Sequence, residues 1–379
     1  MTPARSLSVL LVASATFVAP VPAQEPAPGP AWAAAVEAEL AAQQRQDRIP
    51  GLSCVVAVRG QLALRVGLGL ADVENDVPAS PQTVYRLASI SKPITAVLAM
   101  QLVEQGKLDL DADVHTLVPA WPQKPWPVTT RQLLAHLGGV RHYLREAEST
   151  VHYATQTAGL ACFAADPLLH EPGSKYHYST YGYNLVAAVV EAQSGQPFAQ
   201  VLRERIALPA AAPTLQDDDV RRIVRGRAQG YVRVGDTLQN SELMDASYKL
   251  GGGGLCASAE DLARFCVALL DGKLVAPALL QAMATRQRTT AGEEVDYGLG
   301  LRVDRVGERP LWWHSGAQSR VSTMLLLLPQ ERVVVVVLCN LEQVRLQPLA
   351  RRIAELVAPS PAAGAGEKPP SLGKPPEVR

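Results

Sequence analysis

The sequence predicts an α/β fold, in the sense of an α+β arrangement, in which a central antiparallel sheet is flanked by helices. Strand-like segments lie near both ends of the chain, whereas its middle consists of helical and irregular segments. The last strand-like segment, Val333 to Leu338, is a valine run, which is typical of a sheet buried on both faces. We therefore expect one domain built from both chain ends, with an inserted, mostly helical domain over about residues 95–245.

The composition is that of an enzyme-sized globular protein. With 379 residues, of which 47% are hydrophobic, the chain is long enough to bury a large core. Lys plus Arg and Asp plus Glu both number 36, so the formal net charge is zero and no charged block stands out. This balance gives no reason to expect nucleic acid as a partner.

Residues 1–23 have the layout of a secretory signal peptide. Arg5 precedes an apolar segment from Leu7 to about Ala19, and Val21-Pro22-Ala23 provides small residues for cleavage. We therefore expect a secreted or periplasmic protein without a stable membrane span. The alternative is that the segment is retained as an N-terminal anchor.

The following segments divide the chain further. Residues 24–30 are rich in Pro and Ala and predict a flexible spacer, the catalytic domain is expected over 31–358, and 359–379 predict a disordered tail. The predicted helices are 31–46, 93–102 and 347–357, and the predicted strands are 52–58, 62–70, 311–314, 322–328 and 333–338.

The cysteines and histidines show no metal-ligand spacing, so neither a metal nor a cofactor is expected. Five cysteines, at positions 54, 162, 256, 266 and 339, are an odd number. An exported chain could pair some of them, but burial as small hydrophobic side chains is the preferred interpretation. His136, His142 and His177 are interpreted as structural.

The segment Ser89-Ile90-Ser91-Lys92 lies where a strand-turn region ends and an apolar helix begins. The start of a helix presents unpaired backbone N–H groups, and Ser89 and Lys92 lie on one helical face. This is the geometry of a nucleophile beside its base. Taken alone, the pattern also fits an ordinary helix cap.

Two further segments accompany it: Glu171 to Leu185, which contains Tyr178-Ser179-Thr180, and His314-Ser315-Gly316-Ala317 at the end of a strand. With these three segments in this order, the chain resembles the serine β-lactamase and penicillin-binding protein superfamily. Within it, the chain is most similar to the class C β-lactamase-like branch and to the mitochondrial serine β-lactamase-like proteins. The resemblance implies a β-lactamase/transpeptidase-like fold.

The resemblance also implies roles for individual residues. Ser89 corresponds to the acylated nucleophile and Lys92 to its general base, while Tyr178 shares in proton transfer to the leaving group. We expect the lysine to lower the pKa of the phenol, and burial to lower that of the lysine. Without the resemblance, Tyr178 would be interpreted as a packing residue.

The third segment is expected to line the substrate cleft. His314 takes the place of a lysine in the family pattern, and the backbone N–H groups of Ser89 and Ala317 would form the oxyanion hole. Ser315 and Gly316 would contact substrate. His314 could instead be a core histidine. The glycines Gly251 to Gly254 indicate a close backbone approach that lines the cleft.

Two departures from the family pattern bear on specificity. Thr180 stands where the family has an asparagine, and a hydroxyl cannot replace an amide in holding a substrate amide. His314 removes a permanent cation, which Arg320 could supply, unless Arg320 is a surface residue. We therefore expect esters to be favoured over β-lactams, and a rate that depends on pH near neutrality because of His314.

Together these observations predict a serine hydrolase that acts through an acyl-enzyme on a small-molecule or peptide substrate. The bond attacked is a peptide, amide or ester bond. The alternative is a penicillin-binding or sensing protein, or an assembly-forming relative, with little turnover. The sequence leaves the oligomeric state open.

Overall fold

The protein is described by a computed structural model, which covers residues 30–143 and 151–358. The predicted signal peptide 1–23, nearly all of the spacer 24–30 and the tail 359–379 lie outside the described residues. Among the described residues, no helix combines the length and the apolar character that crossing a membrane would require.

A seven-stranded sheet forms the centre of the fold, as the sequence predicts. Its strand order is β3-β2-β1-β12-β11-β10-β9, and all neighbours pair in antiparallel orientation. The strands are β1 (Gly51–Val58), β2 (Gln61–Asp72), β3 (Val77–Pro78), β9 (Arg302–Val306), β10 (Arg309–Gln318), β11 (Val321–Leu328) and β12 (Val333–Cys339).

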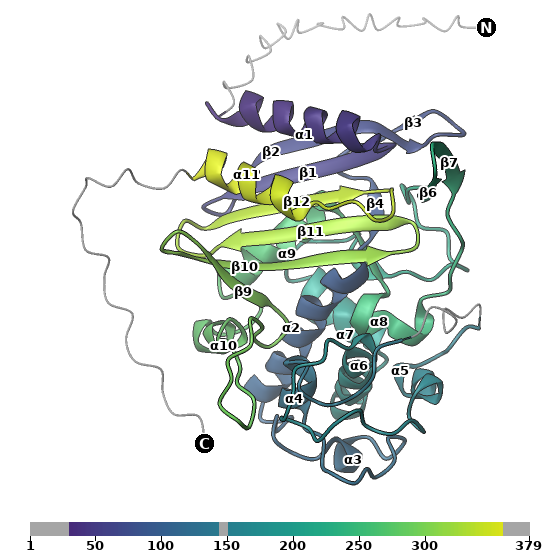
Figure 1. The fold of residues 1–379 in the computed structure, drawn as a ribbon, viewed down its shortest axis with the longest axis vertical. Coiled ribbons are helices and arrows are strands. Elements are labelled where there is room, and N and C mark those ends of the chain that lie inside the picture. Colours follow the sequence, from purple (N-terminus) through teal and green to yellow (C-terminus); the bar gives the residue numbers. More distant parts are fainter. Residues whose placement is uncertain (1–29, 144–150, 359–379) are drawn as a thin grey trace, which may run out of the picture.

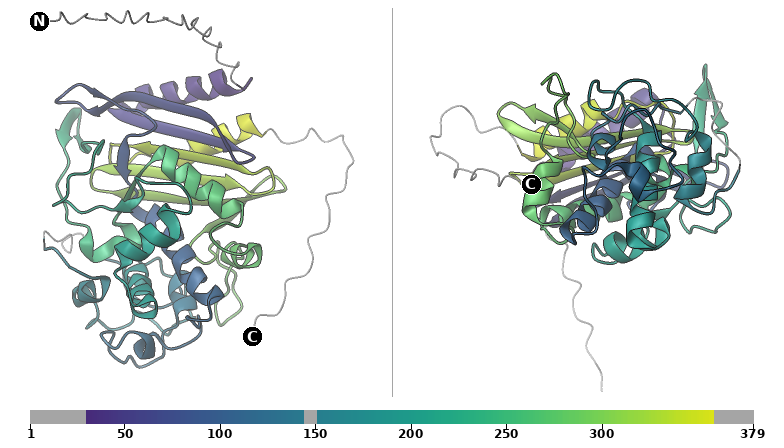
Figure 2. Two further views of the ribbon diagram at one scale, coloured as in Figure 1. Left: turned by 180° about the vertical axis from the view of Figure 1, so that it is seen from behind. Right: turned by 90° about the horizontal axis from the view of Figure 1, so that it is seen from below.

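A strand from the N-terminal part of the chain and one from its C-terminal part pair in the middle of this sheet. β1 pairs with β12 along its length, with Val55 opposite Val336. Every residue of β11 and β12 is buried, because helices cover both faces of these strands. α1 (Ala33–Asp47) and α11 (Gln347–Val357) pack on one face, whereas α9 (Ala259–Leu270) packs on the other (Figures 1 and 2).

The helical body adjoins the face that α9 covers. α2 (Ser91–Glu104) packs against α6 (Thr180–Ser194) and α8 (Leu250–Gly253), and these three helices position the candidate site (Figure 1). Shorter helices complete this body: α3 (Val114–Leu117), α4 (Thr130–Leu134), α5 (Gln156–Gly159), α7 (Phe198–Leu202) and α10 (Pro277–Met283).

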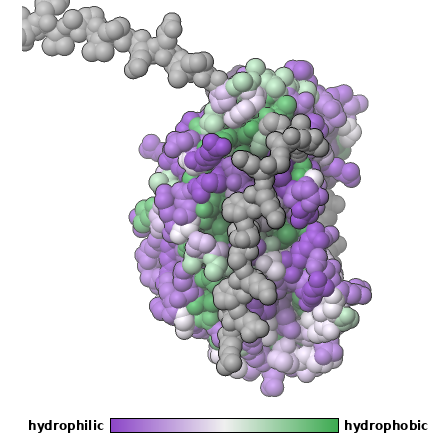
Figure 3. Space-filling model, turned by 90° about the vertical axis from the view of Figure 1, so that its left-hand side faces the viewer, coloured by the Kyte–Doolittle hydropathy of each residue, from purple (hydrophilic) through white to green (hydrophobic). Residues whose placement is uncertain are grey.

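Five short strands of the described chain lie outside the central sheet. β4 (Val84–Arg86), β8 (Leu255–Ser258) and β5 (Gln216–Asp217) form a small sheet, and β6 (Tyr231–Val234) with β7 (Thr237–Asn240) forms a hairpin. Three of them, β5, β6 and β7, fall within the predicted helical insertion. A bridge from Tyr231 to Leu341 ties this hairpin to the segment after β12. On the side that Figure 3 shows, hydrophilic residues predominate and apolar patches lie between them.

The cysteines follow the preferred interpretation. All five are free thiols, and Cys54, Cys256, Cys266 and Cys339 are buried. Burial raises the pKa of the Cys54 thiol to about 12, which makes it unreactive at neutral pH.

Candidate active site

Ser89 lies in a short 3₁₀ helix, η1 (Ala88–Ile90), between the end of β4 and the start of α2. Its neighbours Ala88 and Ile90 are buried, whereas Ser89 is partly exposed. Ala88 has a φ of 48°, in the left-handed region that costs a non-glycine residue about 1–2 kcal/mol. Strain of this kind is often found where the backbone must present a reactive side chain.

Lys92 lies one turn along, as the sequence predicts, and its Nζ has three oxygen partners. These are Ser89 Oγ at 3.0 Å, Thr180 Oγ1 at 3.1 Å and the backbone oxygen of Gly252 at 2.6 Å. The side chain is fully buried. The structure therefore brings the predicted nucleophile and base into direct contact.

Burial lowers the pKa of Lys92 well below its usual value, and the nearby charge of Lys249 lowers it further. A neutral amine has two N–H donors and one lone pair. The carbonyl of Gly252 only accepts, and Thr180 Oγ1 is able to accept the second N–H. The lone pair is then left for the Ser89 hydroxyl, which is the arrangement of a general base.

Tyr178 completes the trio. It is half-buried and hydrogen-bonded to Ser89, and its ring centroid lies 4.9 Å from Lys92 Nζ. The expectation that its pKa would be low is wrong. Burial raises the pKa of the phenol, and this outweighs the hydrogen bond with Ser89 and the charge of Arg302, which lower it. The phenol is therefore a proton donor at neutral pH.

Two histidines that were interpreted as structural support this corner of the site. The His136 ring lies 4.3 Å from the Tyr178 ring, between centroids, and its Nδ1 accepts the backbone N–H of Ser179. His142 Nδ1 accepts the N–H of Thr180. Burial lowers the pKa of His142 to about 4, so the ring is a neutral acceptor. Because both histidines are distant from Tyr178 in the sequence, their position beside it could not be predicted from the sequence.

Thr180 was expected to contact substrate, but its side chain is buried and its hydroxyl bonds to Lys92. The position is at the first residue of α6, and the helix faces α2. Thr180 therefore positions the base.

The end of β10 packs against η1, the short helix that carries Ser89. Residues 314–318 extend past Trp313, the last residue of β10 that pairs with β9. Ser315 and Ala317 are exposed here. A side chain at Gly316 would lie 2.4 Å from the Leu87 oxygen and 2.2 Å from Thr323 Oγ1. Only glycine lets β10 approach the segment before Ser89 so closely. The oxyanion-hole role of Ala317 stays a prediction.

His314 lies in the same end of β10, and its side chain is buried. Its Nε2 lies 3.0 Å from the Tyr297 hydroxyl and its Nδ1 lies 2.7 Å from the Ser315 oxygen. Burial lowers its pKa to about 3. The expectation that His314 titrates near neutrality is therefore wrong, and the observed position is that of a core histidine behind Tyr178.

Arg320 does not supply the expected cation at Ser89. Its guanidinium bonds to Gln229 in a separate pocket, so it is neither a cleft residue nor a solvated surface residue. Sequence reasoning missed Arg302, whose guanidinium carbon lies 5.9 Å from the Tyr178 ring centroid and 5.2 Å from that of Trp313. The position of Arg302 opposite Trp313 in the β9–β10 ladder becomes evident only from the register.

The glycine-rich segment behaves as predicted. In α8, a side chain at Gly251 would meet the Tyr183 oxygen at 2.6 Å, and one at Gly252 would meet Thr180 Cγ2 at 2.6 Å. The close approach places the Gly252 carbonyl on Lys92. Lys249, which the sequence analysis did not single out, is buried at the start of this segment, with its Nζ 4.9 Å from the Tyr143 ring centroid.

In the described part of the chain, no group of three His, Cys, Asp or Glu side chains is arranged to hold a metal ion. The chemistry of the site rests on a hydroxyl, an amine and a phenol.

Comparison with known proteins agrees with this geometry. A family model described as Beta-lactamase matches residues 33–358. The human serine beta-lactamase-like protein LACTB, mitochondrial, is 28% identical over 456 aligned residues, which cover 89% of this chain and 82% of the human protein.

Two solved structures share the fold. The octameric penicillin-binding protein homologue from Pyrococcus abyssi is similar with a TM-score of 0.74 and 25% identity, over 86% of this chain and 77% of that one. The D-amino acid amidase from Ochrobactrum anthropi SV3, complexed with D-phenylalanine, gives 0.75 and 20%, over 86% and 98%. The second likeness concerns the fold alone.

Proposed function

The chain belongs to the Beta-lactamase family and is a serine hydrolase, and we propose that it acts through an acyl-enzyme on Ser89, with ester or amide substrates. The observation that carries this proposal is the 3.0 Å contact between Lys92 Nζ and Ser89 Oγ in a buried environment that favours the neutral amine. A neutral amine beside a hydroxyl is able to take its proton at the moment of attack.

In the proposed acylation, Ser89 Oγ forms a bond to the substrate carbonyl carbon as its proton passes to Lys92. The oxyanion is received by the backbone N–H groups of Ser89 and Ala317. The C–O or C–N bond to the leaving group then breaks. Tyr178, hydrogen-bonded to Ser89, passes a proton to the leaving group and regains one from Lys92.

In the proposed deacylation, water attacks the acyl-Ser89 ester and gives its proton to the neutral Lys92 amine. The Ser89 oxygen leaves and takes a proton back, which restores the starting state. The charge balance requires only that Lys92 alternate between amine and ammonium, and its low pKa favours return to the amine.

The substrate preference that we propose is for esters over β-lactams. Thr180 uses its hydroxyl to hold Lys92, so it offers no amide-like grip on a substrate amide. His314 is neutral and buried, and Arg302 supports recognition of a negative group at the cleft through its position beside Tyr178. An ester with a negative group needs no hold on an amide, and its charge could bind to Arg302.

The test is intact-mass measurement with a fluorophosphonate and with a penicillin, on the wild type, Ser89→Ala and Ser91→Ala. Ser89→Ala should lose labelling and at least about 10³-fold in kcat. Ser91 is the matched control, because its buried hydroxyl faces the Leu255 N–H and not the cleft. Labelling that survives in Ser89→Ala would refute the proposal.

Turnover separates the hydrolase from the sensing or assembly-forming alternative. Steady release of product from a short-chain ester supports the hydrolase, whereas a burst of one equivalent without further release favours a sensor. A kcat/KM for nitrocefin above that for the ester would contradict the proposed preference.

We further propose export, on the pattern of residues 1–23. N-terminal sequencing of the protein from its native host should find a mature chain that begins near Gln24. The human relative carries the word mitochondrial in its name, so fractionation of the host cells should accompany the sequencing.

A further inference from the structure

Three arginines from separate parts of the chain converge on a pocket away from Ser89. Arg86 ends β4, Arg227 precedes β6, and Arg320 lies in the turn between β10 and β11. The pocket has a volume of about 190 Å³. Its lining residues are Tyr85, Arg86, Arg227, Ala228, Gln229, Leu243 and Arg320.

Positive charge exceeds negative charge in this pocket. One buried carboxylate, Asp218, pairs with two of the arginines, at 2.6 Å from Arg86 Nε and 3.2 Å from Arg227 Nη2. Arg320 bonds through Nη2 to the neutral amide oxygen of Gln229, at 2.5 Å. Within the described chain, three guanidinium groups thus face a single carboxylate.

The other nearby acids are engaged elsewhere. Asp217 lies 2.5 Å from Arg222, and Asp219 lies 3.2 Å from Arg221. Glu342 accepts the backbone N–H of Arg320, so its carboxylate is held at the main chain and not at the guanidinium.

Two donors in the cluster have no hydrogen-bond partner among the described residues. They are Arg86 Nη1 and Arg227 Nε, and both atoms are buried. The two Asp218 oxygens likewise accept no hydrogen bond from the described residues, because their contacts with Arg86 and Arg227 are ion pairs without hydrogen-bond alignment. Arg86 is only 7% exposed, so its Nη1 has little access to bulk water. A buried donor of a charged group without an acceptor is costly, which indicates that an acceptor belongs there.

Arg320 is held in place before any ligand arrives. A side chain at Gly230 would lie 2.1 Å from Arg320 Cβ, so the absence of one lets residue 230 pack directly on the arginine stem. Burial, followed by the charge of Arg86, lowers the pKa of Arg320. The unliganded pocket therefore contains like charges that repel one another.

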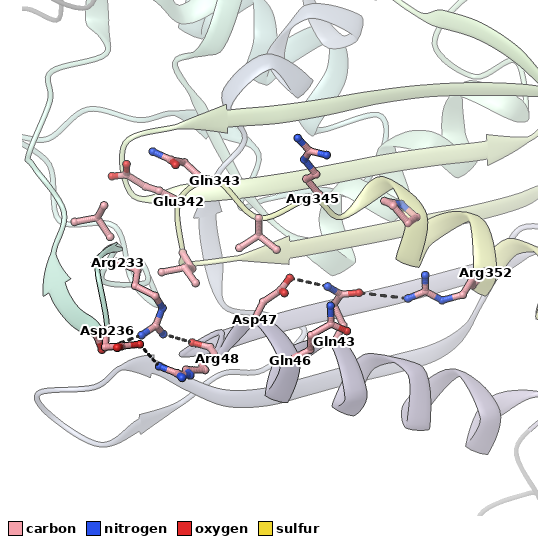
Figure 4. A pocket seen from close by; sticks show the side chains of 14 residues that line it. Gln43, Gln46, Asp47, Arg48, Arg233, Asp236, Glu342, Gln343, Arg345 and Arg352 are labelled. Carbon is pink, nitrogen blue, oxygen red and sulfur yellow. Dashed lines mark hydrogen bonds and ion pairs between the residues drawn. The ribbon is translucent and has the colours of Figure 1, made fainter.

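A second groove in the molecule shows the contrasting case. This groove, of about 720 Å³, lies along α1, α11 and the β6–β7 hairpin (Figure 4). Two of its four arginines have a carboxylate partner each: Arg48 pairs with Asp236 at 3.1 Å, and Arg352 pairs with Glu39 at 2.7 Å. In the three-arginine pocket, by contrast, Arg86 and Arg227 share one carboxylate, and Arg320 has none within 4.0 Å among the described residues.

We propose that the pocket formed by Arg86, Arg227 and Arg320 is an anion-binding site that takes a small oxyanion, a phosphate or a carboxylate group. Guanidinium groups donate paired hydrogen bonds to these groups, and the two unpartnered donors supply the acceptor-seeking positions. The site is separate from the acyl-enzyme chemistry, and the inference does not rest on the proposed function.

Thermal unfolding of the full chain in increasing inorganic phosphate tests the proposal. Ionic strength is held constant with sodium chloride, and a parallel series uses acetate. The melting temperature of the wild type should rise in a saturable way with phosphate, acetate or both, and the two series decide which oxyanion fits. Ser89→Ala should show the same rise, because the pocket does not include Ser89.

Arg320→Gln should weaken the apparent affinity about tenfold or more, because one charged donor is lost. Arg345→Gln is the matched control, since Arg345 is an exposed arginine of the second groove. Without added anion, Arg320→Gln should melt at or above the wild-type temperature, because repulsion is relieved. A purely structural arginine would give a lower temperature.

Arg227→Gln provides a second variant should Arg320→Gln not fold, since the Arg227 side chain is 26% exposed. The absence of a saturable rise in the wild type for both anions would overturn the proposal. A rise that persists unchanged in the arginine variants of the pocket would overturn it as well.

Discussion

Lys92 Nζ lies 3.0 Å from Ser89 Oγ, and the lysine side chain is completely buried. The two facts belong together, because a solvated lysine would carry a proton at neutral pH and could not accept one from serine. The fold lowers the pKa by removing water and gives the amine two acceptors, the Gly252 carbonyl and the Thr180 hydroxyl. The lone pair of the amine is left for the hydroxyl of Ser89.

This burial predicts how stability depends on pH. The folded state holds Lys92 neutral above its lowered pKa, whereas the unfolded chain keeps the lysine protonated up to about pH 10.4. Between these values the unfolded state binds one more proton, so stability rises with pH. The free energy of unfolding of the wild type should therefore increase relative to Lys92→Met between pH 7 and pH 10.

The measurement is urea unfolding of both proteins across that range. The difference between them should have a slope of up to about 1.4 kcal/mol per pH unit, the value for one proton. Tyrosines and cysteines titrate in both proteins, so their contributions cancel. Parallel stability curves would show that Lys92 is protonated in the folded state and is not the base. Activity of Lys92→Met should fall by about 10²–10⁴-fold.

The burial of His314 predicts a loss of stability at acidic pH. Its pKa is about 3 in the folded protein and about 6.5 in an unfolded chain. As pH falls below 6.5, the unfolded state takes up a proton that the folded state refuses, so folding is destabilised by acid. His314→Gln should therefore lose about 2–3 kcal/mol less stability than the wild type between pH 7 and pH 4.5.

Urea unfolding at those two pH values tests this, and the pH profile of kcat/KM between pH 6 and 8 tests the role in catalysis. The profile should keep its shape in His314→Gln, because the neutral histidine does not titrate there. A profile that changes shape in this variant would restore His314 as a titrating catalytic group.

The sequence was sufficient to predict the sheet, because the apolar runs of β11 and β12 are local patterns. It was sufficient for Ser89 and Lys92 as well, since one helical turn fixes their spacing. It failed for the pKa values of Tyr178 and His314, which depend on burial by residues distant in the chain. The predicted role of Arg320 was wrong for the same reason, because its neighbours come from other segments of the chain.

Ala88→Gly should preserve or increase stability, by up to about 1 kcal/mol. Ala88 has a φ of 48°, where glycine has no steric penalty, although the change also loosens the unfolded chain. Ala99→Gly is the matched control, because Ala99 lies inside α2, where the same change should cost about 1 kcal/mol. Equal destabilisation of the two variants, measured by urea unfolding, would show that the backbone at Ala88 carries no strain.

Arg302 is expected to select substrates with a negative group. Its guanidinium lies over the rings of Tyr178, Tyr297 and Trp313. No carboxylate pairs with it within 4.0 Å among the residues that the structure describes. Its charge reaches the catalytic groups, since it contributes to lowering the pKa of Tyr178, against the larger effect of burial. A substrate anion would therefore find an unpaired cation beside Tyr178.

The variant Arg302→Gln should lower kcat/KM about tenfold or more for an ester with an anionic acyl group, such as the p-nitrophenyl half-ester of succinate. For p-nitrophenyl butyrate, which has no charge, the change should be small. Arg305→Gln is the matched control in the same strand, because Arg305 pairs with Glu308 at the surface. Selection by charge requires that the ratio of the two substrates change in Arg302→Gln alone. An equal loss for both esters would mean that Arg302 serves only to pack the aromatic rings.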